Sequence, residues 1–90
     1  MIKQAKVFIK GEVIGVGFRA WTRYHAKRFG IKGWVKNVED QVEALLQAQE
    51  EHIEKLIKKL RKGPPVSNVH KIEIVWEDPK EPLDDFKIVK

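Results

Sequence analysis

Hydrophobic and polar residues alternate along the first part of the chain, as in a strand with one buried face. Over residues 5–13 one face is apolar or small, and the other is mostly charged. The alternation stops over residues 14–19, where apolar residues begin to recur at helical spacing: Phe18, Thr22, Ala26 and Phe29. Gly30 follows as a helix stop. The pattern predicts a strand over 5–13 and a helix over 20–29.

Two further strand patterns follow, over residues 31–38 and 42–48. Only the polar segment Glu39-Asp40-Gln41 separates them. A connection this short permits a hairpin and no crossover, so we expect these two strands to be antiparallel neighbours.

The second helix has the clearest pattern, because its apolar residues fit an i, i+3, i+4, i+7 stripe: Ile53, Leu56, Ile57 and Leu60. Glu50 and Glu51 lie in its first turn and basic residues in its last, as the helix dipole favours. Gly63-Pro64-Pro65 ends it. A strand pattern over 69–76 and a short one over 86–89 complete the chain.

The order βαββαβ, with a terminal extra strand, predicts an α+β fold of the ferredoxin-like sandwich type. We expect an antiparallel four-stranded sheet with two helices on one face, plus a short C-terminal strand at an edge. Ninety residues are enough for one modest core, so residues 1–90 are interpreted as a single domain.

Composition excludes several classes of protein. No apolar run approaches the length of a membrane span. Met1-Ile2-Lys3-Gln4 leads straight into the alternating pattern, without the apolar core of a signal peptide. The lack of cysteine excludes disulfides, a thiolate nucleophile and a thiolate metal site, and it fits a cytoplasmic location. The formal charge of +5 favours anionic partners, although basic and acidic residues are interspersed.

The most distinctive stretch is residues 11–19, which hold three of the six glycines and end on Arg19. Backbone N–H groups freed by glycines, beside a helix N-terminus and a guanidinium, suit a doubly charged oxyanion. The segment lacks the Gly-Lys-Ser/Thr ending of a P-loop. Gly15-x-Gly17-x-x-Ala20 meets only a relaxed dinucleotide fingerprint, which needs a parallel sheet. A phosphate-binding loop and a purely structural turn are the two readings that remain.

A resemblance to a known family favours the phosphate-binding loop. The matching motifs run in register from about residue 5 to the C-terminus: Gly11-x-Val13-x-Gly15-Val16-x-Phe18-Arg19, Ala26-x-x-x-Gly30-x-x-Gly33-Trp34-Val35-x-Asn37, Val42-Glu43, Gly63-Pro64-Pro65 and Phe86-x-Ile88. This set resembles the acylphosphatase family, whose fold is also the ferredoxin-like sandwich.

The resemblance implies metal-independent hydrolysis of the carboxyl–phosphate bond of a small-molecule acyl phosphate, giving carboxylate and phosphate, without a cofactor. It implies that Arg19 and the loop amides bind the phosphoryl group, and that Asn37 positions the attacking water. The loop residues concerned are Gly15, Val16, Gly17, Phe18 and Arg19. The chemistry is consistent, since a carboxylate leaves without a general acid and phosphoryl transfer depends on positioning and charge stabilisation.

Two departures from the family pattern leave the turnover rate open. Ile14 stands where the family usually has glutamine, and the turn over residues 39–41 is one residue shorter. Neither change removes a catalytic group. The alternative function is a non-catalytic acylphosphatase-like module that binds anions or serves as an accessory domain, like those in hydrogenase-maturation factors.

Other candidates carry less weight. RNA-recognition domains share this element order but stack bases on aromatics of the first and third strands, where this chain has Phe8 alone. We therefore expect no nucleic-acid partner, and a monomer. The three histidines lack metal-ligand spacing: His25, His52 and His70. The tryptophans are expected to pack in the core or on the sheet, and Trp34 has the alternative role of a wall of the site: Trp21, Trp34 and Trp76.

Overall fold

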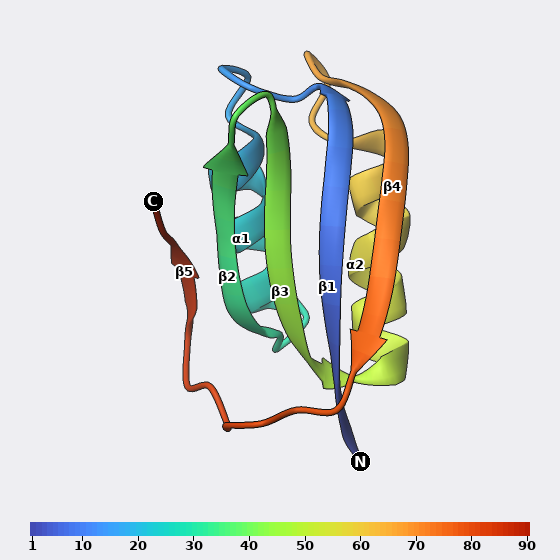
Figure 1. Ribbon diagram of the computed structural model, residues 1–90, viewed down its shortest axis with the longest axis vertical. Helices are drawn as coiled ribbons and strands as arrows, with labels where there is room; N and C mark the ends of the chain where they lie inside the picture. Colours follow the sequence, from blue (N-terminus) through green and yellow to red (C-terminus); the bar gives the residue numbers. More distant parts are fainter.

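In the computed structural model, which describes residues 1–90, a five-stranded sheet is covered on one face by two helices (Figure 1). The elements are β1 (Ile2–Glu12), α1 (Phe18–Arg28), β2 (Lys32–Val38), β3 (Gln41–Gln49), α2 (Glu50–Lys62), β4 (Asn68–Glu77) and β5 (Phe86–Ile88). The strand order is β4-β1-β3-β2-β5. The ferredoxin-like fold is thus confirmed.

One detail of the predicted sheet differs. The first four strands are antiparallel, as expected, but the short C-terminal strand β5 joins the sheet as a fifth strand. It pairs parallel with β2, in a register that sets Ile88 opposite Val35. The long connection after β4 makes this possible, because it carries the chain across the end of the sheet to the far edge (Figure 1).

Two boundaries differ from the sequence pattern by two residues or more, and the others by at most one. β1 begins at Ile2 because its backbone pairs with β3 from there, and this pairing needs no apolar alternation. α1 begins at Phe18 and not at Ala20, since the N–H of Trp21 already donates to the carbonyl of Gly17.

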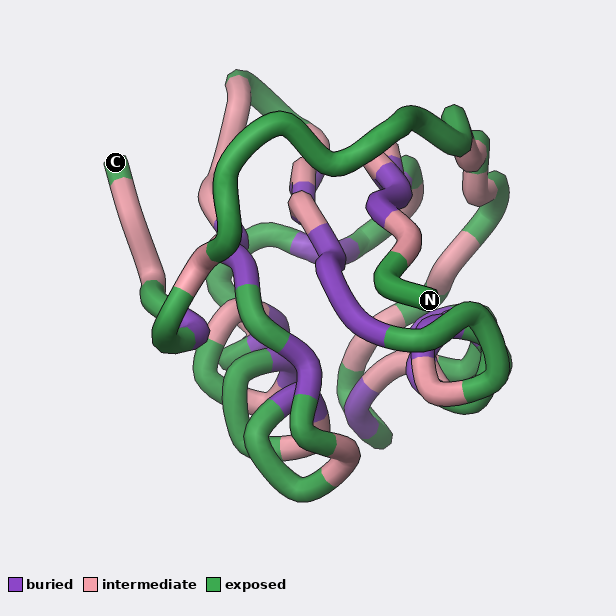
Figure 2. Tube along the Cα trace, turned by 90° about the horizontal axis from the view of Figure 1, so that it is seen from below, coloured by how far each residue is buried: buried purple, intermediate pink, exposed green.

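The core lies between the sheet and the helices. It is one cluster of 17 buried residues, and all four apolar residues of the α2 stripe belong to it. The buried stretches run through the middle of the molecule, while both chain ends are exposed (Figure 2). β2 and β3 approach closely at Gly33, where a Cβ would lie 1.8 Å from the carbonyl oxygen of Leu45. Only glycine fits there.

The sheet face opposite the helices carries polar and aromatic side chains. Trp34 lies there, because its neighbours Gly33 and Val35 face the core. The ammonium groups of Lys6 and Lys36 lie 5.9 and 5.1 Å from the centre of its indole ring. A role for Trp34 as a wall of the site is therefore wrong.

The other two tryptophans behave differently from each other. Trp21 packs partly buried against the core, as predicted. Trp76 lies near the end of β4 and is 44% exposed, so its predicted packing is not realised. Trp76 lies opposite the buried Ala5, but β4 is an outer strand of the sheet, so one side of the indole ring stays open to solvent.

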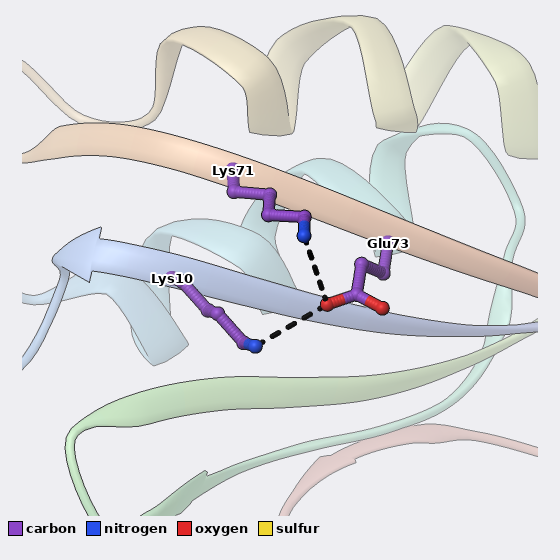
Figure 3. Close-up of polar contacts among 3 residues, drawn as sticks. All are labelled: Lys10, Lys71 and Glu73. Atoms are coloured by element: carbon purple, nitrogen blue, oxygen red, sulfur yellow. Dashed lines mark ion pairs between the residues drawn. The ribbon is translucent and has the colours of Figure 1, made fainter.

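A cluster of three charged side chains links β1 to β4, the outer strand at one edge of the sheet. Glu73 on β4 lies 3.3 Å from the ammonium of Lys10 on β1 and 3.8 Å from that of Lys71 (Figure 3). The hydrogen bond and charge of Lys10, with the charge of Lys71, lower the pKa of the Glu73 carboxyl. All three side chains are about half exposed or more, so the cluster contributes little to stability.

No helix of the protein combines the length and apolar character that crossing a membrane requires.

Candidate active site

The loop between β1 and α1 is shaped by two glycines in the left-handed conformation. Gly15 has φ 75° and Gly17 has φ 77°, which side chains of other residues rarely allow. A Cβ at either position would have no heavy atom within 4 Å. Glycine is therefore required here by backbone conformation and not by lack of space.

The loop leaves backbone N–H groups without partners. None of residues 15–17 donates a backbone hydrogen bond. Gly17 caps α1 without a side-chain hydrogen bond, and the first turn of the helix holds no acidic residue. The positive end of the helix dipole is consequently uncompensated and adjoins free amides, which is the arrangement that binds oxyanions.

These groups surround a small hollow, which we call the cradle. It has a volume of about 200 Å³ and is lined by Val13, Gly15, Gly17, Phe18, Arg19, Ala20, Asn37 and Ile88. Four of the five predicted loop residues line it. Val16 does not, because its side chain packs against the core and anchors the loop.

Asn37 reaches the cradle from a different element. It lies on β2, two residues after the buried Val35, and therefore faces the helix side of the sheet. The loop after β1 and the end of β2 lie at the same end of the molecule (Figure 1). Neither Arg19 nor Asn37 makes a side-chain hydrogen bond or ion pair within the protein, so both are free for a ligand.

Sequence reasoning missed three lining residues: Val13 and Ala20, which flank the predicted loop, and Ile88. Ile88 is the one that is distant in sequence. It comes from β5, and its strand is tied to the body of the protein through Asp85. That carboxylate accepts a hydrogen bond from the N–H of Phe86 at 2.8 Å and lies 3.3 Å from the ammonium of Lys27 on α1. The same two contacts lower the pKa of Asp85, the Phe86 N–H more than Lys27.

No group of three or more histidine, cysteine, aspartate or glutamate side chains is placed to hold a metal ion. His25 is partly buried on α1, with its ring centre 4.7 Å from that of Trp21. Burial lowers the pKa of His25, and the charges of Lys59 and Arg28 lower it further.

Comparisons with known proteins identify the family of this chain. Residues 5–88 match the family model described as Acylphosphatase. The acylphosphatase of Thermococcus kodakarensis is 41% identical over 87 residues, which cover 96% of this chain and 94% of the relative. The chain belongs to the acylphosphatase family. The family, and the hydrolase class that it carries, are therefore confirmed.

Solved structures give the same result. The crystal structure of acylphosphatase from Bacillus subtilis matches with a TM-score of 0.94 at 32% identity, covering 100% of both chains. Full-length HypF, in a phosphate- and nucleotide-bound form, matches with a TM-score of 0.93 at 31% identity. That match covers 100% of this chain but 12% of the HypF chain, so the fold also occurs as a small part of a larger protein.

The two departures from the acylphosphatase pattern lie outside the cradle. Ile14 is 40% exposed and does not line it. The connection between β2 and β3 is only Glu39 and Asp40, with Glu39 in the left-handed conformation at φ 56°. Asn37 lies before this turn and still reaches the cradle.

Proposed function

We propose that this acylphosphatase cleaves its substrate in the cradle. The substrate is a small-molecule acyl phosphate, and the reaction uses no metal or cofactor. The observation that carries the proposal is that free loop amides, Arg19 and Asn37 line one hollow of about 200 Å³. A phosphoryl group needs these donors, and the reaction needs little else from the protein.

Each group has a distinct role in the proposed reaction. The guanidinium of Arg19 and the amides of residues 15–19 hold the phosphoryl oxygens and stabilise the charge that grows on them. The side-chain carbonyl of Asn37 accepts a hydrogen bond from the attacking water, and its NH₂ donates to a phosphoryl oxygen. The water oxygen bonds to phosphorus as the bond from phosphorus to the acyl oxygen breaks. The carboxylate leaves as a stable anion, and the water proton passes to the phosphate product.

The remaining expectations about the protein are also proposals. Residues 1–90 form a single acylphosphatase-like domain, supported by one sheet and one core cluster. The protein works as a monomer, supported by charged residues along the outer strand β4, which disfavour edge-to-edge pairing. It works without nucleic acid, supported by the lack of an aromatic residue on β3 on which a base could stack. A cytoplasmic location rests on the absence of cysteine.

The test is hydrolysis of benzoyl phosphate, followed by ultraviolet absorbance with a chelator present. Arg19→Ala is expected to abolish turnover and substrate binding together. Asn37→Ala is expected to lower mainly kcat, by roughly a hundredfold to a thousandfold, as for other transition-state donors. Arg61→Ala and Asn68→Ala are matched controls on α2 and β4, since neither residue lines the cradle. A fully active Asn37→Ala variant would contradict the water-positioning role, and loss of wild-type activity in the chelator would contradict a metal-free reaction.

The same assay distinguishes the catalytic function from the alternative, a non-catalytic module that binds anions. A folded wild-type protein that binds inorganic phosphate but does not hydrolyse benzoyl phosphate would be a non-catalytic module. The match to part of HypF supports this alternative, because that protein contains the fold within a much longer chain. Phosphate affinity alone does not separate the two functions, since both use Arg19.

A further inference from the structure

A second, larger hollow adjoins the cradle along α1. Its volume is about 640 Å³, and it is lined by Ala20, Arg23, Tyr24, Lys27, Arg28 and Ile88. Ala20 and Ile88 also line the cradle, so the two hollows meet at these residues. We call the second hollow the basic groove.

The charge of the basic groove is positive and only partly neutralised. Three of its six lining residues are cationic and none is acidic. Lys27 is paired with Asp85 at 3.3 Å. Arg23 and Arg28 have no ion pair with a carboxylate, and the guanidinium of Arg28 lies 5.8 Å from the centre of the Tyr24 ring.

Arg23 places a positive charge of the basic groove on the same helix as Arg19 of the cradle. Arg19 and Arg23 are four residues apart on α1 and so lie on the same side of the helix, with a rise of roughly 6 Å between them. Cations in the last helical turn offset the helix dipole, which accounts for Lys27 and Arg28. The helix dipole does not explain Arg23, because this residue lies in the middle of the helix and not in its last turn.

We infer that the basic groove binds a second anionic group on the acyl part of the substrate. The inference rests on the proposed function, in which Arg19 holds the phosphoryl group. An acyl chain that leaves the cradle past Ala20 and Ile88 enters the groove one helical turn further along α1. A carboxylate or phosphate on that chain meets Arg23 and Arg28, whereas a neutral acyl group gains no ionic contact. The preferred substrates are thus acyl phosphates with a distal negative charge.

The experiment compares two rigid substrates of similar shape, 4-carboxybenzoyl phosphate and 4-carbamoylbenzoyl phosphate. The measured quantity is the ratio of their kcat/KM values, determined in the wild type and in three variants. Arg23→Gln and Arg28→Gln each remove one charge from the groove. Arg61→Gln removes the same charge from α2, outside both hollows, and controls for the overall charge of the protein. Comparing variants cancels the difference in intrinsic reactivity between the substrates.

Arg23→Gln is expected to lower the ratio roughly threefold to fivefold, the size of a partly exposed ionic contact, and Arg28→Gln to lower it in the same direction. Arg61→Gln is expected to leave it unchanged. An unchanged ratio in both groove variants would overturn the inference, and so would an equal fall in Arg61→Gln, which would assign the effect to long-range charge. Failure of a folded wild type to hydrolyse either substrate would overturn the proposed function itself.

Discussion

Thr22 lies one helical turn after Phe18 on the buried face of α1, and its hydroxyl is buried without a hydrogen-bond partner. Such a group has lost its hydrogen bonds to water and gained none in return. We expect Thr22→Val to raise the free energy of unfolding by about 1 kcal/mol, because the methyl group takes the same space. Urea unfolding measures this. Thr22→Ser keeps the hydroxyl and removes a methyl group, so it should be destabilising, and a destabilised Thr22→Val would contradict the prediction.

His25 gives stability a pH dependence. Its Nδ1 is buried without a partner, and burial lowers its pKa below the ordinary value of 6.5. As the pH falls, the unfolded chain therefore takes up this proton before the folded protein does. The stability contributed by neutral His25 is complete above about pH 6.5 and is lost as the pH falls through the folded pKa.

The comparison with His25→Gln isolates this contribution. We expect the free energy of unfolding of the wild type to fall more steeply than that of the variant between about pH 7.5 and about pH 5. Urea unfolding at both pH values measures the difference. Equal slopes for the two proteins would show that His25 protonates equally in the folded and unfolded states.

Among the elements, β5 connects the sheet edge to the cradle. Its backbone is held by hydrogen bonds from Gly33 to Asp85 and from Val89 to Val35, both of 2.9 Å. We expect Asp85→Ala to loosen β5, because the variant loses the contacts to Phe86 and Lys27. Amide hydrogen exchange over residues 86–89 should become faster, and kcat/KM should fall roughly twofold to fivefold as Ile88 loses its fixed place.

The matched control is Asp84→Ala, which removes the adjacent carboxylate without touching β5. Equal exchange and equal kcat/KM in the two variants would mean that Asp85 does not anchor the strand.

Local patterns predicted the elements better than the pairings between them. The α2 stripe and the hairpin of β2 and β3 follow from residues close in sequence, so periodicity and turn length were sufficient. The parallel pairing of β5 with β2 joins residues more than fifty positions apart, Gly33 with Phe86, and no local pattern specifies it. Ile88 was missed for this reason.

The candidate site was predictable to different degrees. The glycines and Arg19 could be recognised from residue types alone, because glycine spacing between a strand and a helix indicates a loop of free amides. Asn37 needed the family resemblance, since nothing in its own strand pattern directs it toward a loop that precedes it by some twenty residues. Trp34 packs on the sheet, as predicted. Only its alternative role as a wall of the site was wrong, because alternation separates the two faces of a strand without showing which one faces a site.

At the scale of the whole molecule, anion binding in the cradle should raise the thermal stability of the protein. A ligand that binds only the folded protein stabilises it, by about 1.4 kcal/mol at a concentration ten times its Kd. We expect inorganic phosphate to raise the Tm of the wild type and of Arg61→Ala, but not that of Arg19→Ala. Thermal unfolding followed by circular dichroism measures this, with sodium chloride at matched ionic strength as a control. An equal rise in Arg19→Ala would place phosphate outside the cradle.

The pairing of the first strand with the fourth has a consequence for how the chain folds. The hydrogen bond from Gln4 to Glu77, 2.7 Å long, joins residues 73 positions apart. Closing so long a loop costs conformational entropy before the contacts between its ends can form and stabilise it. We therefore expect folding to take milliseconds to seconds, and not the microseconds typical of small helical bundles. The cradle extends directly from β1, whose two neighbours are β3 and β4. During refolding, hydrolytic activity should therefore return only with the slow closure of the sheet, after both helices have formed.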